Sequence, residues 1–165
     1  MKEGTYHDQF LKTFDEFGDA IFRFCIVKTS DPVLAEDLTQ ETFMRYWQAL
    51  RAEKTMTNTR SFLYTIARNL VIDWYRKKKT DSREQKLDEG LQVADTAVST
   101  EFAAEHREIL RALDTLDAHD AEVLTLRFVE GLEPRDIAEI VGESANTVSV
   151  RINRAVKRLQ IKMHV

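Results

Sequence analysis

The last 22 residues of the chain combine short polar side chains with cations and contain no acidic residue. Between Ser144 and Val165 there are five basic side chains, although the whole chain has a formal net charge of -4. In a helix that enters the DNA major groove, small polar groups of the first turns contact base edges and later cations contact phosphates. The side chains of this stretch therefore suit the binding of duplex DNA. A solvated basic face on an ordinary C-terminal helix is the alternative interpretation.

The apolar positions of this stretch define its outward face. Val148, Ile152 and Ala155 follow helical spacing toward a core. Arg154 is the strongest candidate for a guanine contact, because one bidentate arginine contact contributes about 1 to 3 kcal/mol of discrimination between bases. The full set of candidate duplex contacts is Ser144, Asn146, Thr147, Ser149, Val150, Arg151, Asn153, Arg154, Lys157 and Arg158.

A second basic segment, residues 60–79, alternates aromatic side chains with cations. In "RSFLYTIARNLVIDWYRKKK" six basic residues accompany a single acidic one, Asp73. Such alternation is typical of proteins that hold single-stranded nucleic acid by stacking and charge. However, Phe62, Tyr64 and Trp74 also fall at the spacing of a helix core, which favours packing for most of them. The lysines at 77–79 are also explained by favourable charge at a helix C-terminus.

A third segment, "AEDLTQETFMRYWQAL" at residues 35–50, is amphipathic. Its polar positions Asp37, Gln40, Glu41 and Arg45 alternate at helical spacing with apolar ones. Taken alone, this pattern indicates a solvated helix face.

Helices must position all three segments. Apolar residues at steps of three and four predict a helix from about Tyr6 to Lys28. Asp31 before Pro32 is typical of a capped helix start, and the helix is expected to continue to about Ala52. "EKTMTNTR" is predicted to be a loop, and a third helix is expected over residues 60–79.

Residues 80–100 carry five acidic and two basic side chains and show little apolar periodicity, which predicts a linker. A capped helix with Phe102, Ile109, Leu113 and Leu116 as its buried stripe is expected next, followed by a helix that ends at Gly131. Two further helices, separated by a short turn at Gly142, have the spacing of a helix-turn-helix. The sequence therefore predicts an all-α fold of two small helical domains joined by a flexible acidic linker. The domains are expected at residues 1–79 and 101–165, and the second contains the helix-turn-helix.

Composition argues against several other classes of protein. The single cysteine, Cys25, excludes an internal disulfide, and the four histidines form no ligand-spaced pair, so neither a metal site nor a cofactor is expected. No nucleophile paired with a base and no phosphate-cradling glycine loop is visible, which makes an enzyme the least favoured class. The chain lacks the apolar run of a membrane span or a signal peptide, so we expect a cytoplasmic location.

Taken together, these segments resemble the extracytoplasmic-function class of bacterial RNA polymerase sigma factors over nearly the whole chain. "AEDLTQETFMRYW" is similar to the family's polymerase-binding helix, and residues 60–79 resemble its promoter-melting and minus-ten-reading helix. "LDAHDAEVLTLRFVEGLEPRDIAEIVGESANTVSVRINRAVKRL" resembles its minus-thirty-five-reading domain. The resemblance implies a non-catalytic specificity subunit that binds core RNA polymerase, directs it to promoters and helps to open them.

The resemblance also implies roles for particular residues. Extrusion of a promoter base costs a few kcal/mol, which contacts in a specificity loop corresponding to residues 53–60 must offset. The candidate minus-ten and upstream-phosphate contacts are Lys54, Asn58, Arg60, Arg68, Asn69, Arg76, Lys77, Lys78 and Lys79. The candidate contacts to the polymerase clamp helices are Asp37, Leu38, Gln40, Glu41, Phe43 and Arg45. An anti-sigma factor is expected as a further partner, and the protein is expected to act as a monomer within the polymerase complex.

Two other hypotheses remain open at this point. A conventional helix-turn-helix regulator would bind its operator tightly without polymerase. A pure interaction protein, with basic helices facing an acidic partner or RNA, would support no promoter-dependent transcription.

Overall fold

The computed structural model describes the backbone of residues 2–84 and 100–164, and the regular secondary structure within these ranges consists of helices, with no strand. The prediction of an all-α fold is confirmed. The chain divides into two compact units, Met1–Val98 and Ser99–Val165. Most of the predicted linker, residues 85–99, lies outside the described residues, so the predicted domain boundaries stay a prediction.

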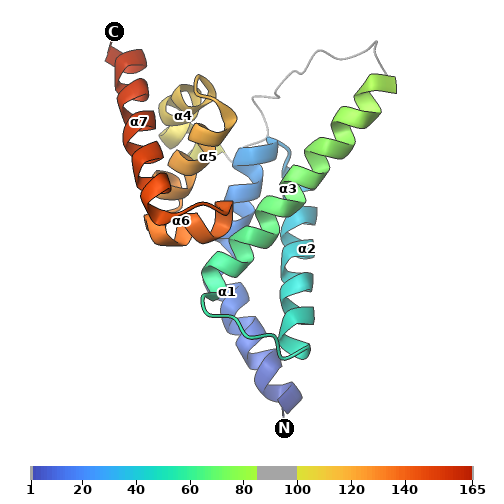
Figure 1. Cartoon of the computed structure of the whole chain (residues 1–165). Coiled ribbons are helices and arrows are strands. Elements are labelled where there is room, and N and C mark those ends of the chain that lie inside the picture. The colour runs from blue at the N-terminus through green and yellow to red at the C-terminus, as the bar shows by residue number, and fades with distance from the viewer. Residues whose placement is uncertain (1, 85–99, 165) are drawn as a thin grey trace. The chain divides into compact units, whose positions relative to one another are not determined.

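Three helices form the first unit: α1 (Lys2–Thr29), α2 (Pro32–Arg51) and α3 (Thr59–Glu84). They run up, down and up, and each contacts the other two (Figure 1). The largest side chains buried between them include Phe24 of α1, Tyr46 of α2, and Leu63 and Tyr64 of α3. Tyr64 is fully buried and its ring lies edge-on to Phe24, so its role is packing, as its spacing predicted.

Local capping chemistry sets the start of α2. The Asp31 Oδ1 accepts hydrogen bonds from the amides of Val33 (3.1 Å) and Leu34 (3.2 Å), and Pro32 occupies the first helical position. This confirms the predicted boundary. The ends of the other two helices differ from expectation: α1 begins at Lys2 instead of Tyr6, and α3 continues to Glu84 beyond Lys79.

The second unit contains α4 (Thr100–Asp114), α5 (Ala118–Leu124), α6 (Pro134–Val141) and α7 (Ala145–His164), with a π-helical turn, η1 (Thr125–Val129), directly after α5. The Asp117 carboxylate caps α5 by accepting from the Asp120 amide at 2.9 Å. In the π-helical turn the Glu130 amide donates to the Thr125 carbonyl at 3.0 Å. This widened turn was not predicted.

The helix-turn-helix consists of α6 and α7. Gly142 ends α6 in the left-handed region, with φ of 75°, where a glycine is favoured because it has no Cβ. Ser144 caps α7 by accepting the Thr147 amide at 3.1 Å. Ile137 and Val148, one from each helix, are fully buried. Both predicted signals of the turn are therefore confirmed.

One predicted core position in the second unit is wrong. Ile109 of α4 is 45% exposed, whereas Leu113, one turn later, is buried. Helix α4 contacts α5 and α7 within its unit. These two helices leave Ile109, at the edge of the apolar stripe, partly uncovered.

Candidate nucleic-acid interfaces

Helix α7 exposes a short row of polar and basic side chains. The exposed members of the predicted set are Ser144, Asn146, Thr147, Val150, Asn153, Arg154, Lys157 and Arg158, while Ser149 and Arg151 are half-buried. Arg154 lines a small depression of about 210 Å³ together with Asn146, Thr147 and Val150. Among the described residues, no ion pair engages Arg154 or Lys157. These side chains are therefore placed to meet an external anion.

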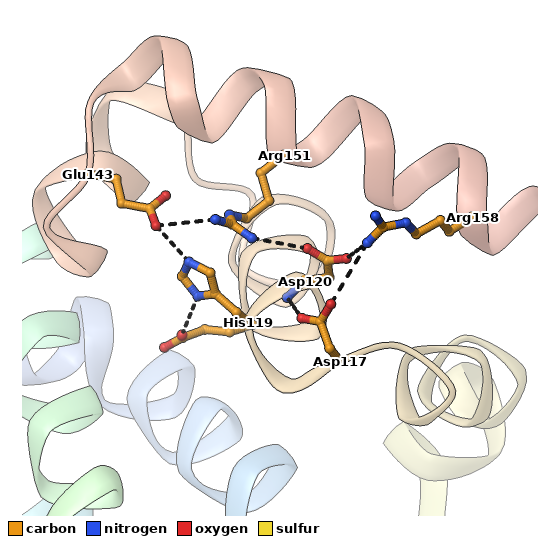
Figure 2. Close-up of polar contacts among 7 residues, drawn as sticks. Asp117, His119, Asp120, Glu143, Arg151 and Arg158 are labelled. Carbon is orange, nitrogen blue, oxygen red and sulfur yellow. Dashed lines mark hydrogen bonds and ion pairs between the residues drawn. The ribbon is translucent and has the colours of Figure 1, made fainter.

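Two arginines of the predicted set are instead bound to acidic residues of their own unit (Figure 2). Arg158 Nη1 lies 2.7 Å from Asp120 Oδ2 and 3.8 Å from Asp117 Oδ2, and Arg151 Nη1 lies 3.4 Å from Asp120 Oδ1. The Asp120 side chain is only 3% exposed. A buried carboxylate needs compensating positive charge, and two arginines of α7 supply it. Arg151 and Arg158 therefore tie α7 to α5, and their assignment as DNA contacts stays a prediction.

A histidine and two glutamates extend this network to the turn of the helix-turn-helix. Glu143 Oε1 lies 2.7 Å from His119 Nε2 and 3.5 Å from Arg151 Nη2, and His119 Nδ1 lies 3.7 Å from Glu122 Oε2 (Figure 2). The hydrogen bond with His119, with a further contribution from the Arg151 charge, holds the pKa of Glu143 below its usual value. The turn, α5 and α7 are thus joined by one chain of polar contacts.

In the first unit, the predicted single-strand surface combines the loop before α3 with α3 itself. Asn58 caps α3, since its Oδ1 accepts the Ser61 amide at 3.1 Å. The remaining predicted residues lie at different exposures. Lys54, Asn69, Arg76, Lys77, Lys78 and Lys79 are exposed, while Arg60 and Arg68 are half-buried.

Two aromatic rings of this surface carry lysines on their faces. Lys54 Nζ lies 5.2 Å from the centre of the Phe62 ring, and Lys78 Nζ lies 4.8 Å from that of Trp74. Both rings are half-buried, so they pack on one side and hold a cation on the other. Phe62 and Trp74 thus contribute to the packing of the first unit and also to its exposed basic surface, the two roles that the sequence left open for them.

The face of α2 predicted to bind a protein partner is partly exposed and partly core. Asp37, Gln40, Glu41 and Arg45 are exposed, and Arg45 Nε lies 3.0 Å from Glu41 Oε1. By contrast, Phe43 is 2% exposed and Leu38 is 9% exposed. Leu38 and Phe43 therefore lie beneath the exposed residues of α2, and their assignment as polymerase contacts stays a prediction.

Two exposed apolar residues on α2 were missed in the sequence. Val33 is 71% exposed and Met44 is 54% exposed. Val33 lies four residues before Asp37 and Met44 four residues after Gln40, which places them on the same face, and this spacing was visible in the sequence. They add apolar area to a polar surface.

Other kinds of site find no support in the part of the chain that the structure describes. Among the side chains that the structure describes, no histidine, cysteine, aspartate and glutamate residues form a cluster suited to a metal ion. Within residues 2–84 and 100–164 no helix has both the length and the apolar character to span a bilayer.

Comparisons with known proteins agree with both units. Residues 13–80 match Sigma-70 region 2, and residues 106–159 match Sigma-70, region 4. The chain is 31% identical over 160 residues to the ECF RNA polymerase sigma factor BldN of Streptomyces coelicolor, covering 92% of this chain but only 59% of BldN. It is 30% identical over 147 residues to the RNA polymerase sigma factor SigV of Bacillus subtilis, covering 85% of this chain and 81% of SigV.

A solved structure shows the same similarity. The sigma factor RpoE of Bartonella quintana, in complex with the anti-sigma factor NepR, matches with a TM-score of 0.74 at 25% identity, covering 95% of this chain and 98% of that one. The chain belongs to the extracytoplasmic-function class of RNA polymerase sigma factors, the initiation factors that bring RNA polymerase to promoters.

Proposed function

We propose that three surfaces divide the work of a promoter-specificity subunit. The exposed face of α2 binds the clamp helices of core RNA polymerase, the loop at 52–58 with α3 binds the melted minus-ten strand, and α7 reads the minus-thirty-five duplex. The observation that carries this proposal is the occurrence of both family regions in one chain, each with an exposed polar surface. The protein acts by binding alone and catalyses no step itself. Its proposed location is the cytoplasm.

For the duplex, the ion pairs within the second unit narrow the set of reading residues. Arg151 and Arg158 hold Asp120, whereas Asn146, Asn153, Arg154 and Lys157 are exposed. We assign base contacts to Asn146, Thr147, Asn153 and Arg154, because bidentate or short polar groups read base edges. We assign a phosphate contact to Lys157, because a lysine acts as a point charge.

For the melted strand, the lysines above Phe62 and Trp74 supply positive charge close to aromatic rings. Exposed lysines held beside aromatic rings suit a single strand, since these cations can neutralise its phosphates. Asn69 and Arg76 lie exposed on the same helix, where they reach bases and upstream phosphates respectively.

An anti-sigma factor is the proposed regulatory partner. RpoE of Bartonella quintana was solved with its anti-sigma factor, and this chain matches RpoE along nearly its whole length. The protein acts as a monomer within the polymerase complex.

Binding to purified bacterial core RNA polymerase tests the proposal. Asp37→Arg with Gln40→Ala changes the exposed face of α2, and Asp15→Arg with Gln9→Ala makes the matched change on exposed positions of α1. We expect the α2 variant to lose at least about tenfold in affinity, equivalent to 1.4 kcal/mol, and the α1 variant to bind like wild type.

Two results would contradict the proposal. Equal affinity of the α2 variant and wild type would remove α2 as the docking helix. Absence of binding by the folded wild-type protein, together with tight binding to DNA alone, would favour a stand-alone helix-turn-helix regulator.

A further inference from the structure

The residue that begins the loop between α2 and α3 has an unfavourable backbone conformation. Glu53 has φ of 53°, in the left-handed region that favours glycine. Its amide donates to the Leu50 carbonyl at 3.0 Å, and the next amide, that of Lys54, donates to the Ala49 carbonyl at 3.0 Å. These two bonds form the Schellman motif that ends many helices, usually with glycine at the position that Glu53 occupies. A glutamate at this position is therefore unfavourable for the backbone, and contacts of its side chain must offset that cost.

The carboxylate of Glu53 is bound by two side chains from the start of α1. Tyr6 Oη donates to Glu53 Oε1 at 2.8 Å, and Lys2 Nζ donates to the same oxygen at 3.0 Å. The hydrogen bond from Tyr6, followed by that from Lys2, lowers the pKa of Glu53, and the same contact raises the pKa of Tyr6. These contacts join residues 47 and 51 positions apart in the sequence.

The opposite end of the loop is also fixed. Asn58 caps α3 through the Ser61 amide, and Lys54 lies over the Phe62 ring. Only Thr55 and Thr57 are exposed between Lys54 and Asn58. The loop is therefore held to α1 at its start and to α3 at its end, with a short exposed segment between.

We propose that Glu53 is a positioning residue which, through Tyr6 and Lys2, holds the start of the loop against α1 and thereby sets the selectivity of the loop for the minus-ten base. This inference rests on the proposed function, in which the loop at 52–58 contacts an extruded base. Discrimination by such a pocket requires that its polar groups are held in place before the base enters. An amide or carboxylate at position 53 keeps the tether, whereas glycine releases it.

Four variants separate this role from a purely structural one. Glu53→Gly removes the tether but suits the backbone conformation, Glu53→Gln keeps an acceptor for Tyr6, and Tyr6→Phe removes one donor. Glu3→Gln is the matched control, because Glu3 pairs with Arg51 at 3.9 Å on the same two helices without contacting the loop.

The primary measurement is transcription by the holoenzyme on promoter libraries randomised at the minus-ten or the minus-thirty-five element. For Glu53→Gly and Tyr6→Phe we expect the minus-ten preference to fall by about threefold to tenfold, the range for loss of one ordinary hydrogen bond, because the Glu53 side chain is 55% exposed. The minus-thirty-five preference, polymerase affinity and urea midpoint should stay at or above wild-type values. Glu53→Gln and Glu3→Gln should keep most of the minus-ten preference.

A full minus-ten preference in Glu53→Gly would overturn the inference, and so would an equal loss at both promoter elements. Amide hydrogen exchange of residues 52–58 in the full chain gives an independent readout. Faster exchange in Glu53→Gly than in Glu3→Gln is expected, and equal exchange would refute the tether. If wild-type holoenzyme showed no promoter preference, the proposed function would fail, and the exchange data would still decide whether Glu53 holds the loop.

Discussion

The ionic contacts of Asp120 allow a quantitative prediction about the second unit. Asp120→Asn removes a charge that is 97% buried, keeps the side-chain shape, and leaves Arg151 and Arg158 without their shared carboxylate. Breaking a fully buried pair costs about 3 to 5 kcal/mol. Because the two arginines are 30% and 57% exposed, water offsets part of this cost. We expect a loss of about 1.5 to 3 kcal/mol, and a domain of 60 to 100 residues loses about 4 to 8 °C in Tm per kcal/mol.

The chain supplies its own spectroscopic control for this measurement. Both tryptophans, Trp47 and Trp74, lie in the first unit, so their fluorescence reports on that unit, whereas far-ultraviolet circular dichroism reports on all helices. In urea denaturation of full-length Asp120→Asn, the fluorescence transition of the first unit should stay at its wild-type midpoint. The loss of dichroism that occurs without a fluorescence change, which reports unfolding of the second unit, should move to lower urea concentration. Asp114→Asn, at an exposed position of α4, is the matched control.

Two outcomes would refute this reasoning. A dichroism transition unchanged from wild type would show that Asp120 contributes nothing to stability. An equal shift in Asp114→Asn would show that general charge, and not the buried contacts, is responsible.

Further predictions concern α7 and the turn before it. Arg154→Ala should relax discrimination at one base pair by about 1 to 3 kcal/mol in a holoenzyme competition assay, and equal relaxation at every position would contradict a base contact. Lys157→Ala should weaken all promoters alike and reduce the salt slope of binding by about 1, as removal of one phosphate contact requires. The folded-state pKa of Glu143 is lowered, so its contribution to stability is complete above the usual glutamate value of 4.5 and is lost as the pH falls below it. The stability gap between wild type and Glu143→Gln should therefore shrink from about pH 6 to about pH 3, that is, within about 1.5 pH units of that value, and a constant gap would contradict this.

Local signals in the sequence predicted the boundaries that depend on neighbouring residues. The cap at Asp31 and the left-handed turn at Gly142 each require only residues within one helical turn. The start of α1 was predicted too late because Lys2 is held by Glu53, far away in the sequence. The end of α3 was predicted too early because the apolar repeat ends at Trp74, although no glycine or proline follows before residue 90.

In the candidate interfaces, too, features that depend on neighbouring residues could be predicted, whereas contacts between distant residues could not. The outward direction of Asn153 and Arg154 follows from helical spacing alone, and the structure leaves both exposed. The engagement of Arg151 could not be predicted, because its partner Asp120 lies 31 positions earlier and is placed by tertiary packing. The burial of Phe43, in contrast, could be predicted from its apolar spacing, although the family resemblance implied a polymerase contact for it.

The internal ion pairs of the second unit also bear on how this protein is distributed in a cell. Of the five cations between Ser144 and Val165, Arg151 and Arg158 neutralise Asp120, and Lys162 donates to the Thr115 carbonyl. On α7, Lys157 is left for a phosphate and Arg154 for a base, and one phosphate contact from this helix adds little affinity for random DNA at physiological salt. A genome offers about a million or more competing random sites, which would sequester a strongly basic protein. Because Arg151 and Arg158 are paired with carboxylates of their own unit, the second unit holds less of this protein at random sites than its count of cations would suggest.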